Sequence, residues 1–127
     1  MKRVKCDLFG ENEYVFFNVM RLMQLEKAIG CKIADVLANP FGLGDMMLAY
    51  EIGLKHEGKK RTAAWYAEKC DELFEEGVSL DELMSPIMKA LIGSGVFGPQ
   101  AYAIAFPEEV SEEEKEELKA KAELEKN

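Results

Sequence analysis

The chain has 127 residues, of which 48% are hydrophobic and 31% charged, and this composition is typical of one folded globular domain rather than of a disordered protein. Its 24 acidic and 16 basic residues give a net charge of -8, which argues against general binding to nucleic acid or to an anionic membrane. The cysteines Cys6, Cys31 and Cys70 show no C-x-x-C spacing and indicate free, buried thiols. With no signal-like segment at its start, the sequence predicts a cytoplasmic protein.

The first 18 residues predict a β-hairpin. Val4 to Phe9 forms one strand candidate, and the aromatic and β-branched run from Tyr14 to Phe17 forms the other. Gly10 to Glu13 lies between them and contains residues that tolerate turn dihedrals. Because an isolated hairpin is marginally stable, we expect it to pack on helices.

From Val19 onward, apolar residues recur at three- and four-residue spacing, which predicts helices. We expect them over residues 19–29 and 44–56, from a Thr62 cap to a Gly77 stop, and from a Ser79 cap through Leu91, with a short helical turn at 32–38. Gly30 and Gly58 end the first two, which places His56 in the last turn of the second, beside exposed carbonyl groups. Pro86 lies inside the fourth, so we expect a kink there or a restart capped by Ser85.

The acidity is concentrated at the C-terminus. Residues 108–127 hold nine acids and four lysines, a net charge of -5 that leaves only -3 for the preceding 107 residues. Ser111 opens a capping box there, followed by a helix that is polar nearly all round. We therefore expect a single mainly helical domain over residues 1–107, with the hairpin at 1–18, and an acidic helical or partly disordered tail over 108–127. The fold class is mainly α, with the hairpin packed on a compact bundle of about four to five helices.

Two motifs invite a catalytic interpretation and do not support it. Gly93 to Gly98 matches G-x-G-x-x-G, but it follows a predicted helix rather than a strand, so we interpret it as a helix terminus and a tight turn. His56 and Glu57 begin an H-E-x-x-H pattern that fails because no second histidine exists. We predict no catalytic, cofactor-binding or metal-ligating residue, and we do not expect an enzyme.

Partner binding has stronger candidates. The uncharged residues Val96, Phe97, Tyr102, Ile104 and Phe106 lack a clear period, and they either wrap over the core or form a partner surface. The seven methionines fill the core or supply an adaptable binding surface.

Two charged features are open to more than one interpretation. Glu26 interrupts an apolar stripe, either as a boundary residue or as the partner of a cation at the hairpin. The basic patch of Lys55, Lys59, Lys60 and Arg61 is either a solvated loop or a contact for an acidic partner or for the chain's own acidic tail.

The order of elements resembles a known family. The residues Arg21 to Gly30 are similar to the R-x-x-x-L-E-x-x-[L/I]-G opening of small phage tail assembly chaperones, which also continue into a short helix, here Ile33 to Leu37. Tyr50 to His56 is similar to a helix end in that family that reads x-Gly-Leu-Lys/Arg-His. The similarity extends over residues 4–92 in the order of elements, whereas residues 96–106 and the acidic tail have no counterpart in it.

The resemblance implies a non-catalytic chaperone encoded by a phage or prophage, which binds the tape measure protein in the host cytoplasm and assists tail tube assembly. It also implies contact with the tail tube protein, and it leaves self-association and a longer frameshifted product open. The alternative from another class is a non-catalytic bacterial adaptor or regulatory interaction protein with a folded partner.

Overall fold

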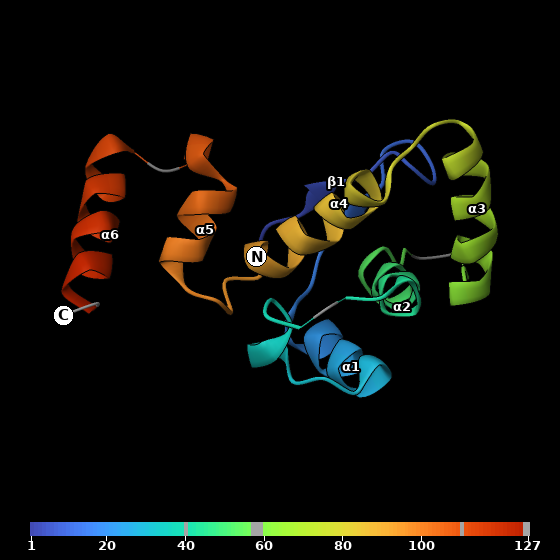
Figure 1. The fold of residues 1–127 in the computed structure, drawn as a ribbon, viewed down its shortest axis with the longest axis horizontal. Coiled ribbons are helices and arrows are strands. Elements are labelled where there is room, and N and C mark those ends of the chain that lie inside the picture. The colour runs from blue at the N-terminus through green and yellow to red at the C-terminus, as the bar shows by residue number, and fades with distance from the viewer. Residues whose placement is uncertain (40, 57–59, 110, 126–127) are drawn as a thin grey trace.

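The computed structural model describes residues 1–39, 41–56, 60–109 and 111–125, and it confirms a mainly α fold that begins with a β-hairpin (Figure 1). In chain order the elements are β1 (Val4–Lys5), β2 (Tyr14–Val15), α1 (Val19–Ile29), η1 (Ile33–Asp35), α2 (Leu43–Gly53), α3 (Ala63–Glu75), α4 (Leu80–Gly93), α5 (Pro99–Ala105), η2 (Pro107–Glu109) and α6 (Glu112–Glu125). The two η elements are single turns of 3-10 helix. None of the helices in the described ranges is long and apolar enough to cross a membrane.

The hairpin is shorter than predicted. Val4 pairs with Val15, and Lys5 pairs with Tyr14. Beyond these two pairs the chain forms a loop, and the backbone N–H of Cys6 donates a hydrogen bond across it to the carbonyl of Glu13 at 2.8 Å. The strands end early because the residues that follow them turn toward the core. Phe9 and Phe17, which were expected to end the two strands, are buried there. The hairpin packs on helices, as expected for so small a sheet.

The predicted helix starts and stops are largely confirmed. The side chains of Asn18, Thr62 and Ser79 each accept a hydrogen bond from a backbone N–H in the first turn of the helix that follows. Gly30 and Gly77 follow the ends of α1 and α3 with φ values of 66° and 96°, the left-handed region that glycine tolerates. Local chemistry therefore determines most of the helix boundaries.

α2 ends earlier than predicted, so His56 lies three residues beyond the helix and not in its last turn. The carbonyl of Gly53 accepts hydrogen bonds from the N–H of Phe16 at 3.0 Å and from Nη1 of Arg21 at 2.8 Å. The carbonyl of Lys55 accepts from Nη2 of the same arginine at 2.9 Å. These tertiary partners satisfy the carbonyls that a longer helix would use internally, and the predicted stop at Gly58 lies outside the described residues.

α4 runs as one helix through Pro86, so of the two predicted alternatives, a kink or a restart capped by Ser85, the restart is wrong. The proline removes one backbone hydrogen bond, but residues on both sides of it remain on a common buried face. Leu83 and Ile87 are completely buried on either side of the proline, and Ala90 and Leu91 continue the face. Tertiary packing therefore keeps the helix continuous.

The core lies around α2, which packs against α1, α3 and α4, while the hairpin covers α4. An aromatic cluster forms its centre, in which the ring of Phe9 meets those of Tyr50 and Tyr66 edge-on at centroid distances of 4.8 Å. α5 packs on α4, and α6 packs on α5. As Figure 1 shows, α3 and α6 therefore lie at opposite ends of the molecule.

Candidate functional site

The outer face of α1 exposes apolar side chains. Leu22 and Leu25 point into the core, whereas Met20 and Met23 are 63% and 57% exposed, and Val19 before them is also exposed. The two methionines line an open groove of about 740 Å³, which we call the α1 groove. Its other lining residues are Gln24, Glu26, Lys27, Gly30, Cys31 and Lys32.

Glu26 lines the α1 groove and is half-buried, which agrees with its interpretation as a boundary residue. The carboxylate of Glu26 accepts a hydrogen bond from the backbone N–H of Ile33 at 2.9 Å, so it caps η1 instead of pairing with a cation at the hairpin. Asn39 donates to the thiol sulfur of Cys31 at 3.1 Å and to the carbonyl of Asp35 at 3.0 Å. Cys31 is therefore half-buried in a polar contact, unlike Cys6 and Cys70, which are buried as predicted.

The structure divides the five uncharged residues of segment 96–106. Phe106 is buried, and Phe97 is half-buried against the core. Tyr102 is half-buried on α5, while Val96 and Ile104 are exposed, the latter to 83%. Part of segment 96–106 thus packs on the rest of the protein, and its exposed part consists of the aliphatic side chains of Val96 and Ile104. The helix α5 itself was not predicted, because seven residues give too little periodicity to detect.

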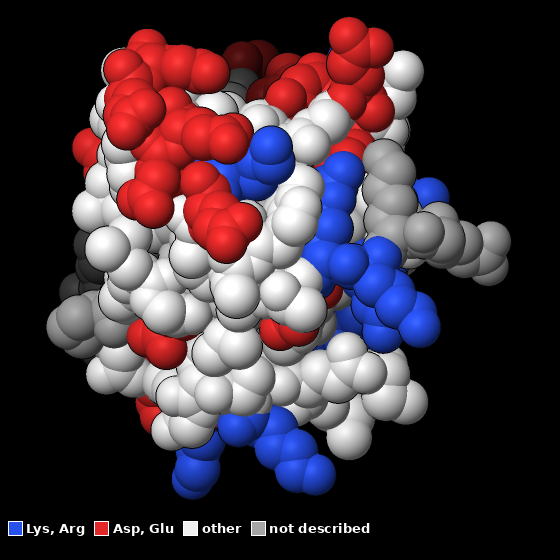
Figure 2. All heavy atoms as spheres, turned by 90° about the vertical axis from the view of Figure 1, so that its right-hand side faces the viewer, with Lys and Arg blue, Asp and Glu red and all other residues white. Residues whose placement is uncertain are grey.

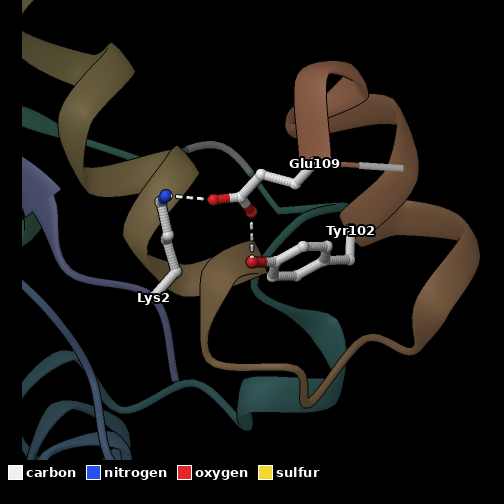
Figure 3. Close-up of polar contacts among 3 residues, drawn as sticks. All are labelled: Lys2, Tyr102 and Glu109. Atoms are coloured by element: carbon white, nitrogen blue, oxygen red, sulfur yellow. Dashed lines mark hydrogen bonds and ion pairs between the residues drawn. The ribbon is translucent and has the colours of Figure 1, made fainter. Parts of the chain in front are cut away.

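Lys2, Tyr102 and Glu109 connect the N-terminus to the segment after α5, and we call these contacts the latch (Figure 3). The backbone N–H of Lys2 donates to the carbonyl of Gly93 at 2.8 Å, and its ammonium group pairs with the Glu109 carboxylate. The hydroxyl of Tyr102 donates to the same carboxylate at 2.6 Å. The hydrogen bond from Lys2, with that from Tyr102, lowers the pKa of Glu109 below its ordinary value.

The predicted basic patch has a more specific structure than a solvated loop. Arg61 donates from Nη1 to the carboxylate of Glu13 at 2.6 Å, and its guanidinium lies 4.5 Å from the ring centroid of Trp65. This hydrogen bond raises the pKa of Arg61, while burial acts against it. Glu13 is 2% exposed and was not singled out in the sequence, where nothing distinguishes it from other acids in turns.

A cleft of about 460 Å³ lies beside this ion pair, and we call it the basic cleft. Its lining residues are Gln24, Glu51, Ile52, Leu54, Lys55, Lys60, Arg61, Thr62 and Tyr66. Figure 2 shows the α3 end of the molecule, where Lys and Arg side chains gather below an acidic rim. Lys59, the fourth member of the predicted patch, lies outside the described residues.

The glycine motif is a connection between helices, as predicted. Gly93 is the last residue of α4, and Gly95 and Gly98 follow with φ values of 86° and 90° before α5 begins. The motif therefore has no strand before it, although a dinucleotide site requires one. Over the described ranges, no group of three or more His, Cys, Asp or Glu side chains is placed to hold a metal ion.

Comparison of the chain with family models, with curated proteins and with solved structures finds no match.

Proposed function

We propose that the protein is a non-catalytic phage or prophage tail assembly chaperone that binds the tape measure protein through the α1 groove and assists tail tube assembly. The observation that carries the proposal is the exposed apolar face of α1. Two neighbouring methionines, Met20 and Met23, line an open groove there, although the buried face of the same helix already supplies its share of the core.

Exposed methionines suit a partner whose surface is irregular. Their unbranched, polarisable side chains adapt to different neighbours, and they recur on surfaces that bind several helical sequences. The groove runs beside one helix, which is the arrangement that accepts the apolar face of an amphipathic helix. A long amphipathic helix of a tape measure protein is such a partner, because it exposes apolar residues until the tail tube encloses it.

The rim of the groove adds a charge preference. Lys27 and Lys32 are exposed along it, and Glu26 is engaged with the backbone of η1. Acidic residues beside the apolar stripe of a partner helix would therefore be attracted to this groove. The net charge of -8 keeps the resulting complex soluble.

Co-expression with a tape measure fragment tests the proposal. The wild-type chain should raise the soluble yield of the fragment and co-purify with it. The variant Met20→Glu/Met23→Glu should lose at least about tenfold in affinity, because removing two apolar anchors costs about 1 kcal/mol or more each. Both positions are exposed, so the variant should unfold at nearly the wild-type temperature.

A matched control places the same charges on other exposed apolar residues. Leu80→Glu/Leu124→Glu changes two such residues on α4 and α6 and should leave binding intact. The proposal fails if the wild-type chain neither solubilises nor retains the fragment. Equal losses in the two variants would also contradict it, because net charge rather than the groove would then explain the effect.

A further inference from the structure

The basic cleft contains two lysines for which the described part of the chain supplies no ion-pair partner. Arg61 is paired with Glu13, but the exposed ammonium groups of Lys55 and Lys60 form no ion pair with any residue in the described ranges. The first turn of α3, which Thr62 caps, begins at the same cleft and adds the positive end of a 13-residue helix. Glu51 is the one carboxylate among the described lining residues, against Lys55, Lys60 and Arg61, so the lining favours an acidic occupant.

The most acidic element of the chain lies at the other end of the molecule. α6 contains seven acids and three lysines, and it is anchored by its contact with α5. Glu114 and Glu117 line a small cleft with Pro99 of α5, which turns this side of the helix toward the body. Glu113 and Glu116 are exposed and do not line that cleft.

These two elements lie apart within one copy. Figure 1 shows α3 and α6 at opposite ends, with the core and α5 between them. The acidic tail therefore does not neutralise the basic cleft of its own chain in this structure. The complementary surface is available on a second copy.

We propose that α6 of one copy docks, by the side that carries Glu113 and Glu116, into the basic cleft of a second copy. The two surfaces differ from each other, so the contact is heterologous and propagates head to tail instead of closing a symmetric pair. The proposal does not depend on tape measure binding, since among the residues that the structure describes the α1 groove shares only Gln24 with the lining of the basic cleft.

Sedimentation velocity of the full chain tests this over a wide concentration range, at about 20 mM and about 500 mM salt. The wild-type protein should form a concentration-dependent series of oligomers at low salt, and these should dissociate at high salt because the contacts are charged and near the surface. Reversing either surface, with Lys55→Glu/Lys60→Glu or with Glu113→Lys/Glu116→Lys, should weaken association by about tenfold or more. Circular dichroism should confirm that both variants retain the wild-type helix content.

Mixing the two reversed variants provides the decisive comparison. In each variant alone, the cleft and the docking side of α6 carry charges of the same sign, so the variant should stay monomeric. In the mixture, the cleft of one variant and α6 of the other carry opposite charges, so the two should associate at low salt. Lys5→Glu/Lys89→Glu changes the net charge by the same amount as the cleft variant but alters exposed lysines outside both the cleft and the α1 groove, so it should associate like the wild type.

Two results would overturn the proposal. One is a wild-type protein that remains monomeric at low salt, and the other is association that the cleft variant and the Lys5/Lys89 control weaken equally. A synthetic peptide of residues 111–127 should also bind the intact protein more tightly than a peptide with the same residues in scrambled order. Equal binding of the two peptides would make the cleft a general acceptor of acidic chains and would contradict docking of α6.

Discussion

Glu13 and Arg61 form an ion pair at the junction between the hairpin and α3, and it connects segments 48 positions apart in the chain. The carboxylate is almost completely buried, and it lies over Gly10, where a side chain would overlap it. The guanidinium lies against the Trp65 ring, which covers it further. A pair of this kind is costly to break, because a buried charge then loses a compensating charge close to it.

Arg61→Met should therefore destabilise the fold by about 3 kcal/mol, because it removes the guanidinium that compensates the buried Glu13 carboxylate while keeping an apolar stem against Trp65. Denaturant unfolding at neutral pH measures this loss.

Glu13→Gln is the matched change, because its amide oxygen still accepts from Arg61, and it should cost about 1 kcal/mol. If Arg61→Met were no more costly than Glu13→Gln, the ion pair would contribute little, and packing of the arginine stem would explain its position.

At the scale of elements, the two glycines of α2 have opposite surroundings. A Cβ at Gly53 would lie 2.6 Å from Cζ of Phe17 and 2.8 Å from Cγ2 of Val15, so the hairpin packs directly on the backbone of the helix end. A Cβ at Gly44 would meet nothing within 4 Å. The same substitution in one helix therefore has two different expected results.

Gly53→Ala should destabilise the protein by about 2 kcal/mol, because the overlap forces the hairpin away from α2. Gly44→Ala should stabilise it by about 0.5 kcal/mol, because alanine restricts the unfolded chain and favours the helix. Thermal unfolding of both variants measures the two shifts. Shifts of the same sign would show that helix propensity, not contact with the hairpin, controls stability at these positions.

The elements also show how far sequence reasoning extends. Helix starts at Asn18, Thr62 and Ser79 follow from side chains that bond to backbone only three residues away, and Thr62 and Ser79 were predicted as caps from the sequence. The early end of α2 depends on Arg21, which reaches its carbonyls from 32 residues away. Contacts at that separation leave no periodic signal in the sequence, so the predicted end at residue 56 was wrong.

The candidate surfaces could likewise be predicted from the sequence only in part. The methionines and the basic patch were recognised from composition and clustering, but only the fold places Met20 and Met23 outward and Met46 and Met47 inward. The Glu13–Arg61 pair was not predicted, because it joins a turn to a helix start through a long chain separation. Segment 96–106 was recognised as unusual, and its division into buried and exposed residues depends on the packing of α5 on α4.

At the scale of the whole molecule, the latch connects α5, and through it α6, to the N-terminal strand. Lys2 pairs with Glu109 and also lies 5.7 Å from the ring centroid of Phe106, while Tyr102 donates to the same carboxylate. The body and the acidic C-terminal helix are thus held together partly by one carboxyl group near the surface. The position of α6 relative to the basic cleft depends on this connection.

Acidification should loosen α5 before it unfolds the body. The pKa of Glu109 is lowered in the folded state, so its contribution is fully present above the unfolded pKa, about 4.3, and is lost as the pH falls through the folded pKa. Hydrogen exchange over residues 99–109, corrected for intrinsic rates, should therefore accelerate below a pH of about 4, while the amides of α2 remain protected. Lys2→Met should produce the same local acceleration at neutral pH, because it removes the ion pair between the Lys2 ammonium group and the Glu109 carboxylate. Lys5→Met, which removes only an exposed pair with Asp7 at 3.6 Å, should leave exchange in α5 unchanged. If Lys2→Met also left it unchanged, the packing of Phe106 alone would hold α5 on the body, and the orientation of α6 would not depend on pH through Glu109.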